Sequence, residues 1–206
     1  MQSFSTLMGT QTLLPIIQAD SAGQGVDIAR AMQAAGIKLV EVVLRTPESL
    51  DALSAIKQAL PELTVGAGTV IDKATLTQAI NAGADFIVTP ASSPELLEQL
   101  AGCGIPALPG VSNTGDILLA SEAGFSELKL FPASLSGGAP FLNAVGSVFQ
   151  HIRFCPTGGV NAENQQDYLS LPNVFAVGGT WVAKPNWVQA GDWASITQAC
   201  KQALTG

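Results

Sequence analysis

Residues 37–66 have the sequence IKLVEVVLRTPESLDALSAIKQALPELTVG, which contains one complete unit of the predicted fold. The apolar runs Ile37–Leu44 and Leu63–Gly66 are short enough for strands and apolar enough to be buried. Between them, Pro47–Leu60 begins with proline and is rich in alanine and leucine, which favour a helix. Two strands on either side of a helix predict a parallel βαβ unit.

The same alternation continues along the chain in both directions from this unit. The expected strands are Leu13–Gln18, Ile37–Leu44, Leu63–Gly66, Phe86–Thr89, Ile105–Leu108, Glu127–Phe131, Ile152–Pro156 and Val174–Val177. The expected helices are Gly25–Ala35, Pro47–Leu60, Lys73–Asn81, Pro94–Ala101, Thr114–Ala123, Ala139–Phe149, Glu163–Leu169 and Trp193–Leu204. This order predicts an α/β fold with a parallel sheet.

Eight strands, each followed by a helix at a regular spacing of about 20–25 residues, predict a single (β/α)8 TIM barrel. An open doubly wound sheet has the same alternation and is the alternative. The even spacing, without a long insertion, favours the barrel. No linker divides the chain, so we expect one domain over residues 1–206, with a short N-terminal segment, residues 1–11, before the first strand.

Composition excludes several classes of partner. The 206 residues are 47% hydrophobic and 12% charged, which is ample material for a core. Nine scattered basic residues and a net charge of −7 argue against nucleic acid as a partner. No apolar run reaches the roughly 18 residues of a membrane span, and Met1–Gln11 lacks the basic segment of a signal peptide. We therefore expect a cytoplasmic protein with no membrane partner.

The residues that commonly bind metals are few and dispersed. His151 is the only histidine, and Cys103, Cys155 and Cys200 are widely spaced without a CxxC pair. Structural and catalytic zinc sites need several such ligands close together. The odd number of cysteines argues against a disulfide framework. The sequence therefore predicts reduced thiols and no metal site.

One lysine interrupts an expected strand, in the hexapeptide Glu127-Leu-Lys-Leu-Phe-Pro132. Burial of Lys129 among large apolar side chains would be costly, because desolvation disfavours the ammonium form. The neutral amine is a nucleophile, as Schiff-base chemistry requires. The alternative is that Lys129 extends past the strand to solvent. The hexapeptide alone leaves both readings open.

In a barrel of this kind, the catalytic groups lie at the C-terminal ends of the strands. Side chains alternate along a strand, so Glu41 and Arg45 share one face of theirs, and Lys129 and Phe131 share one face of the other. We expect the carboxylate, the guanidinium and the amine to converge on one pocket. The alternative for Glu41 and Arg45 is a buried salt bridge without a catalytic role.

Glycine pairs follow the last two expected strands, in Thr157-Gly158-Gly159 and Gly178-Gly179-Thr180. Glycine lets the backbone approach a ligand closely and present its N–H groups. The loops after the seventh and eighth strands often hold phosphate in this fold. The two pairs therefore predict a phosphate site, and the alternative is two tight turns that bind nothing.

Two segments resemble signatures of the 2-keto-3-deoxy-6-phosphogluconate (KDPG) and 4-hydroxy-2-oxoglutarate (KHG) aldolase family. Residues 36–45, GIKLVEVVLR, resemble its signature of a glycine, a glutamate and a Leu-Arg pair. Residues 124–133, GFSELKLFPA, followed by Gly137, resemble the signature of its Schiff-base lysine. Residues 65–70, 105–110 and 153–159 support the match. The resemblance covers nearly the whole chain, from about Pro15 to Ala199.

The resemblance implies a class I, metal-independent aldolase on a (β/α)8 barrel, typically a homotrimer. Such an enzyme is a lyase of the Entner–Doudoroff pathway and needs no cofactor, because the substrate forms a covalent imine with Lys129. The implied partner is a small keto-acid phosphate, KDPG, which is cleaved to pyruvate and glyceraldehyde 3-phosphate. KHG, which gives pyruvate and glyoxylate, is implied as a further substrate.

The resemblance also implies a role for individual residues. Lys129 would form the imine, and Glu41 would be the general acid and base. Arg45 and Thr69 would bind the carboxylate of the keto acid, while Pro90 and Phe131 would line the pocket around it. The residues implied for phosphate binding are Gly158, Gly159, Gly179 and Thr180.

Three positions depart from the family pattern. Val43 stands where many members have threonine, Thr180 where many have serine, and Gln18 where galactonate-type relatives tend to have arginine. These departures concern substrate preference and leave Lys129 and Glu41 untouched. Two other functions stay open: another phosphate-binding barrel enzyme, such as an epimerase or a synthase, and a non-catalytic sugar-phosphate sensor. Neither would need Lys129.

Overall fold

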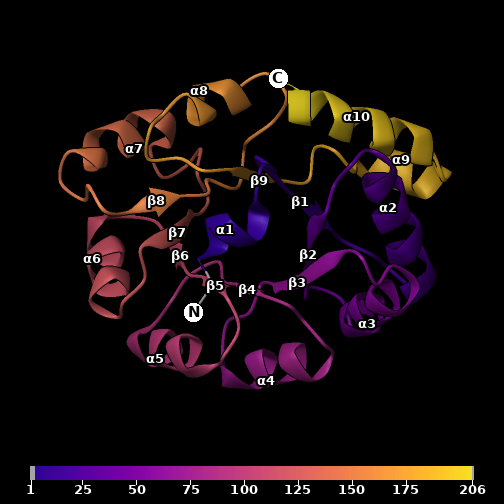
Figure 1. The fold of residues 1–206 in the computed structure, drawn as a ribbon, viewed down its shortest axis with the longest axis horizontal. Coiled ribbons are helices and arrows are strands. Elements are labelled where there is room, and N and C mark those ends of the chain that lie inside the picture. Colours follow the sequence, from indigo (N-terminus) through magenta and orange to yellow (C-terminus); the bar gives the residue numbers. More distant parts are fainter. Residues whose placement is uncertain (1–2, 206) are drawn as a thin grey trace.

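The computed structural model describes residues 3–205 and has an α/β fold with a curled parallel sheet (Figure 1). Six strands pair in the order β5-β4-β3-β2-β1-β9, and three pair in the order β6-β7-β8. All of these pairs are parallel. The strands are β1 (Leu13–Ile17), β2 (Leu39–Val43), β3 (Thr64–Gly68), β4 (Ile87–Val88), β5 (Ala107–Leu108), β6 (Gly110–Val111), β7 (Glu127–Leu130), β8 (Arg153–Phe154) and β9 (Val177–Gly179).

Two connections link the six-stranded and three-stranded sheets. Only Pro109 separates β5 from β6, and its carbonyl accepts a hydrogen bond from the Lys129 amide at 2.8 Å. On the other side, isolated parallel bridges join Phe154 to Val174 and Thr157 to Gly178. The parallel pairing therefore continues from β5 into β6 and from the end of β8 into β9.

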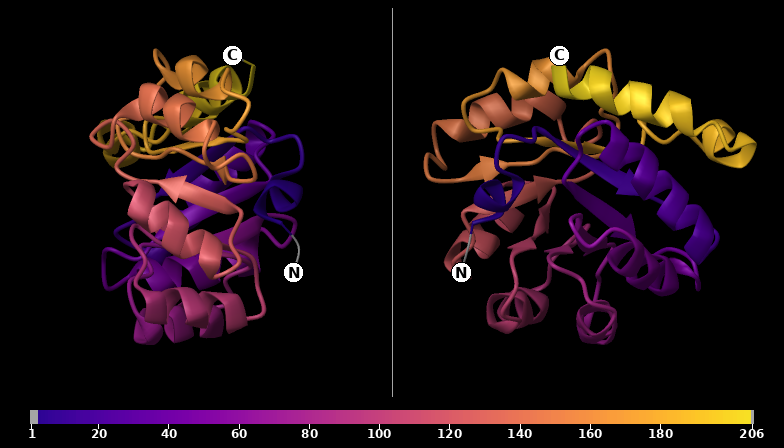
Figure 2. Two further views of the ribbon diagram at one scale, coloured as in Figure 1. Left: turned by 90° about the vertical axis from the view of Figure 1, so that its left-hand side faces the viewer. Right: turned by 45° about the vertical axis from the view of Figure 1, so that its right-hand side comes forward.

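Apart from α1, the helices lie outside the strands (Figures 1 and 2). The last helix, α10, packs beside α2, where the Thr197 hydroxyl donates a hydrogen bond to the Ala31 carbonyl at 2.8 Å. No helix within residues 3–205 is long and apolar enough to cross a membrane. The helices are α1 (Phe4–Met8), α2 (Ala22–Ala34), α3 (Ser49–Ala59), α4 (Lys73–Asn81), α5 (Pro94–Gly102), α6 (Thr114–Glu122), α7 (Gly138–Gly146), α8 (Gln165–Leu169), α9 (Pro185–Ala190) and α10 (Trp193–Thr205).

The buried apolar side chains form two clusters. The larger cluster includes Val42, Leu128 and Leu130, together with residues of the surrounding helices. The smaller one, which we call the inner cluster, includes Phe4 and Met8 of α1, which lies within the curl of the strands (Figure 1). The buried members of the inner cluster are Phe4, Met8, Leu14, Leu39, Phe86, Val88, Leu108, Cys155 and Ala176.

Helix α1 was not expected from the sequence. Five residues are too few to show helical periodicity, but Phe4 and Met8 are four residues apart and so lie on one face. The Ser3 side chain caps the helix, and Phe4 packs edge to face on Phe86 with ring centroids 5.1 Å apart. The expected N-terminal segment thus contains a helix, and its first two residues lie outside the described part of the chain.

The expected strand segments all contain strand or lead directly into it. The last one differs most, because β9 comprises Val177–Gly179 and not Val174–Val177. Gly178 and Gly179 are thus in the strand and not in a turn after it. A Cβ on Gly178 would overlap the Thr157 hydroxyl, and one on Gly179 would overlap the Trp181 ring. These glycines make room for side chains, a requirement that sequence propensity does not show.

Candidate active site

Lys129 and Glu41 meet inside the curled sheet, from strands β7 and β2. Lys129 Nζ lies 3.4 Å from Glu41 Oε1, and the two side chains are only 4% and 0% exposed. The lysine therefore does not extend to solvent. Among the described residues, Glu41 forms its ion pair with Lys129 and not with Arg45, so the alternative of a buried Glu41–Arg45 salt bridge is not found.

A glycine on the neighbouring strand makes room for the Glu41 carboxylate. Gly68 of β3 pairs in register with Val43, and a Cβ at this position would overlap Glu41 Oε1. The second carboxylate oxygen, Glu41 Oε2, is buried without a hydrogen-bond partner among the described residues. A buried carboxylate oxygen without a partner lowers stability. Such oxygens are often found at functional sites, where a ligand or a water supplies the missing hydrogen bond.

The amine and several predicted residues line one cavity of about 170 Å³. As predicted from strand periodicity, Val43 and Arg45 reach it from one side, and Lys129 and Phe131 from another. The Lys129 amine lies 5.1 Å from the centre of the Phe131 ring. The residues that line the cavity are Ile16, Val43, Arg45, Lys129, Phe131, Thr157, Gly158, Gly159, Val160, Gly179 and Thr180.

Arg45 and Thr69 form a polar pair at the end of β2 and β3. Arg45 Nε donates to Thr69 Oγ1 at 3.3 Å, and the guanidinium is largely exposed. Thr69 has φ 62°, a left-handed conformation that a β-branched residue rarely adopts, and it is the one described non-glycine residue with positive φ. Such strain is often found where a side chain must be held in a defined place for function.

The loop after β8 presents its backbone to the same cavity. Gly158 and Gly159 have φ of 93° and 78°, which favour glycine, and both line the cavity together with Val160. Across from them, Gly179 and the exposed Thr180 come from the end of β9. The structure therefore brings the four predicted phosphate residues together, although only the first pair forms a turn.

A second cavity, of about 290 Å³, adjoins the first and shares Ile16, Arg45 and Thr180 with it. Its other walls come from the loop after β1 and from α9. They include Gln18, which the sequence singled out, and Gln189. The first cavity, which we call the catalytic cavity as a candidate, thus adjoins a second one whose walls carry amide, apolar and charged side chains, Asp20 among them. A substrate longer than a three-carbon acid has space there.

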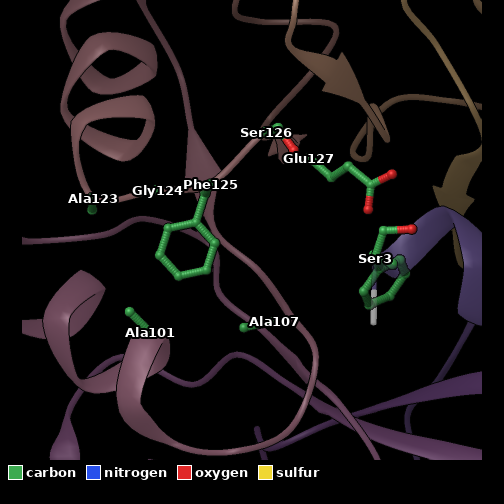
Figure 3. A pocket seen from close by; sticks show the side chains of 9 residues that line it. Ser3, Ala101, Ala107, Ala123, Gly124, Phe125, Ser126 and Glu127 are labelled. Atoms are coloured by element: carbon green, nitrogen blue, oxygen red, sulfur yellow. The ribbon is translucent and has the colours of Figure 1, made fainter. Parts of the chain in front are cut away.

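A separate cavity of about 320 Å³ lies near the beginning of β7 (Figure 3). It is lined by Phe125 and several alanines, and the Glu127 carboxylate extends toward Ser3 at the start of α1. Glu127 Oε2 accepts a hydrogen bond from the Ser5 amide at 3.0 Å. This carboxylate therefore anchors α1, and the cavity contains no lysine or cysteine that could act as a nucleophile.

Cys155 belongs to the inner cluster, next to the Lys129–Glu41 pair. Its thiol is fully buried, and burial raises its pKa to about 12, with smaller opposing effects of the charges on Lys129 and Glu41. Burial likewise raises the pKa of the Cys200 thiol to about 12. Cys103 is partly exposed, and all three cysteines are free thiols.

This difference predicts how the thiols react. At pH 8, a thiol with a pKa near 12 is ionised in only about one molecule in 10⁴. Ellman's reagent should therefore modify one thiol per native chain, at Cys103, and all three after denaturation. Peptide mapping identifies the modified residue. Rapid modification of Cys155 in the native protein would show that water and reagents reach the inner cluster.

Not every predicted residue lines the catalytic cavity. Glu41, Thr69 and Pro90 do not. The buried Glu41 contacts the Lys129 amine behind the cavity wall, Thr69 bonds to Arg45, and Pro90 packs against Gly110. Conversely, Thr157 and Val160 line the cavity and were missed as site residues. Thr157 could have been found, because it precedes the glycine pair that the sequence did single out.

Comparison with known proteins shows which proteins share this arrangement. A model of the KDPG and KHG aldolase family matches residues 5–199. A protein of Pseudomonas aeruginosa named 2-dehydro-3-deoxy-phosphogluconate aldolase is 42% identical over 199 residues, which are 97% of this chain and 90% of that one. The KHG/KDPG aldolase of Escherichia coli is 36% identical over 204 residues, or 99% and 96% of the two chains.

Solved structures agree with these matches. A KDPG aldolase from Legionella pneumophila superimposes with a TM-score of 0.94 at 35% identity, covering 97% of each chain. That protein was crystallised with pyruvate captured at low pH as a covalent carbinolamine intermediate. Nearly the whole chain, and not only the strand ends, is therefore similar to these enzymes.

Proposed function

Because the chain belongs to the KDPG and KHG aldolase family, we propose that Lys129 forms the Schiff base through which it cleaves its substrate. The chain is an aldolase, a lyase that acts through an imine on KDPG. The observation that carries the assignment of Lys129 is its burial beside Glu41 in a cavity that opens toward two glycine-containing segments. Activity on KHG is part of the same proposal.

The first half of the reaction builds an electron sink. The neutral Lys129 amine attacks the C2 carbonyl of KDPG to give a carbinolamine, which loses water to form a protonated imine. Glu41 Oε1 is 3.4 Å from this nitrogen, so the carboxylate is placed to receive the amine proton and return it to the departing hydroxyl. The buried setting excludes bulk water, which would otherwise compete for these protons.

The second half breaks the C3–C4 bond. As a base removes the C4 hydroxyl proton, the bond's electron pair moves into the imine, leaving an enamine on Lys129 and releasing glyceraldehyde 3-phosphate. Glu41 acts as this base, directly or through one water. Protonation of the enamine at C3 and attack of water on the imine then release pyruvate and restore the free amine.

The remaining predicted residues bind the ends of the substrate. Arg45, oriented by Thr69, would pair with the C1 carboxylate through charge-assisted hydrogen bonds. Phe131 lines the cavity beside the amine. Pro90 lies against Gly110, which pairs in register with Lys129, and keeps its predicted pocket role in this proposal. Gly158, Gly159, Gly179 and Thr180 would bind the phosphate. Backbone amides bind an anion without a net positive field, which suits a chain of charge −7.

The Thr180 hydroxyl gives a direct test of the phosphate assignment. Thr180→Ala should raise KM for KDPG by about 10- to 150-fold, because a hydrogen bond to a charged group is worth roughly 1.5–3 kcal/mol. KM for KHG, which has no phosphate, should change by less than about twofold. Steady-state kinetics on both substrates measure this ratio. Equal changes in the two KM values would show that Thr180 serves only the fold.

Several properties of the molecule as a whole are part of this proposal. The parallel pairs from β1 to β7, with the bridges between β8 and β9, support a single closed (β/α)8 barrel formed by one domain. No cofactor is needed, because the imine supplies the electron sink. Within residues 3–205, no group of three or more His, Cys, Asp or Glu side chains could hold a metal ion. Metal independence is proposed by similarity to the family. A homotrimer and a cytoplasmic location are proposed by similarity to the family.

Release of pyruvate from KDPG, followed with lactate dehydrogenase and NADH, tests the function. We expect turnover that is unchanged by EDTA and that stops when borohydride is added together with pyruvate. An epimerase or a synthase would release no pyruvate from KDPG. A sensor would bind KDPG without consuming it, and borohydride would have no effect. Any of these last results would refute the proposal.

A further inference from the structure

In the loop after β8, hydrogen bonds to the carbonyl groups of Gly158 and Gly159 fix two successive peptide units. The Gly158 carbonyl accepts from the Ser134 amide at 3.0 Å, and the Gly159 carbonyl accepts from Asn164 Nδ2 at 2.9 Å. In a planar trans peptide, the carbonyl and the following N–H point in opposite directions. The bond to Gly159 therefore fixes the direction of the Val160 N–H.

The N–H groups of the same two peptide units are those of Gly159 and Val160, and both are free to donate a hydrogen bond to a ligand. No described residue accepts a hydrogen bond from the Gly159 or Val160 amide, and both residues line the catalytic cavity. Val160 is buried, whereas Gly159 is exposed. A buried amide without a partner, such as that of Val160, is uncommon in folded proteins. An anionic group in the cavity would satisfy them.

Both ends of the Asn164 side-chain amide form hydrogen bonds to the backbone of this loop. Its Oδ1 accepts from the Asn161 amide at 2.8 Å, while its Nδ2 donates to the Gly159 carbonyl. Since one end must accept and the other must donate, only an amide of this length satisfies both bonds. Asn164 does not line the cavity itself, so it would act through the backbone.

We propose that Asn164 is a positioning residue for the phosphate of the substrate, and that Val160 contributes its backbone N–H as a phosphate donor. The inference rests on the proposed function, since it assumes that the loop after β8 binds phosphate. Asn164 anchors the Gly159–Val160 peptide with its carbonyl turned away from the cavity. Without that anchor the peptide can rotate and direct its carbonyl oxygen at the anion, which repels it.

Asn164→Ala tests this inference. KM for KDPG should rise about tenfold, and the inhibition constant of inorganic phosphate against KHG cleavage should rise by a similar factor. Both kcat and KM for KHG should stay within about twofold of wild type. Asn164→Asp keeps the bond to Asn161 but cannot donate to Gly159, so it should raise KM for KDPG at least as much as alanine does.

Asn173→Ala is the matched control, because Asn173 Nδ2 also donates to a backbone carbonyl, that of Leu142 at 2.9 Å, away from the catalytic cavity. Thermal midpoints of the two alanine variants show the structural cost of losing such a bond. KM for KDPG should rise only in Asn164→Ala. If wild type favours KDPG and is inhibited by phosphate but both variants behave alike, only this inference fails. If wild type shows neither property, the phosphate assignment fails and this inference fails with it.

Discussion

Lys129→Ala is expected to abolish pyruvate release from KDPG, because Lys129 supplies the one amine that pairs with Glu41 among residues 3–205. Lys129→Arg should be equally inactive, since a guanidinium is not deprotonated in a protein and cannot attack a carbonyl. In wild type, incubation with pyruvate and borohydride should add one reduced pyruvyl group to the peptide that contains Lys129. Peptide mass spectrometry locates the adduct.

A second lysine provides the control for this result. Lys184 is exposed, and its amine lies 4.7 Å from the centre of the Trp187 ring, outside the catalytic cavity. Lys184→Ala should keep full activity and full labelling at Lys129. Labelling found only at Lys184, or a Lys129→Ala variant with normal turnover, would overturn the assignment of the nucleophile.

Glu41→Gln is expected to lower kcat by about 10²–10⁴-fold, which is the usual contribution of a positioned acid or base. Glutamine has the same shape as glutamate, so it fits beside Gly68 but cannot carry protons. The variant should still bind pyruvate. Borohydride trapping should show slow imine formation, and rapid-quench measurements should locate the loss in proton-transfer steps.

Glu127→Gln separates a catalytic carboxylate from a structural one. Glu127 begins the strand that carries Lys129, but its carboxylate accepts from the Ser5 amide, away from the cavity. Its replacement should lower stability more than turnover. A loss below threefold in Glu41→Gln would mean that the Glu41 carboxylate serves only to pair with Lys129, as in a buried salt bridge.

The predictable parts of this molecule are those that depend on local pattern. Apolar runs at even spacing predicted the order of strands and helices, and the two-residue period of β2 and β7 placed Glu41 and Lys129 on the inward face. These signals are local because a buried strand needs apolar residues whatever its partners are. The predicted face of each strand is confirmed by the cavity that Val43, Arg45 and Phe131 share.

What the sequence did not show depends on contacts between distant segments. Gly68 is needed because of Glu41, and Gly178 because of Thr157, so neither requirement can be read from the flanking residues. β9 was placed three residues too early because glycines carry no strand propensity. The role of Asn164 depends on a hydrogen bond across five residues to Gly159, in a loop with no periodic pattern.

Helix α1 has a consequence for the order in which products leave. Phe4 and Met8 are buried in the inner cluster, so this end of the curled sheet is apolar in the part of the chain that the structure describes. We therefore expect substrate, water and both products to pass through the cavity that Arg45 and Thr180 line. In the proposed mechanism, pyruvate stays bound to Lys129 until a water attacks the imine, and the aldehyde phosphate would occupy the cavity through which that water comes. The aldehyde is then expected to leave first, and its release admits the water that frees pyruvate.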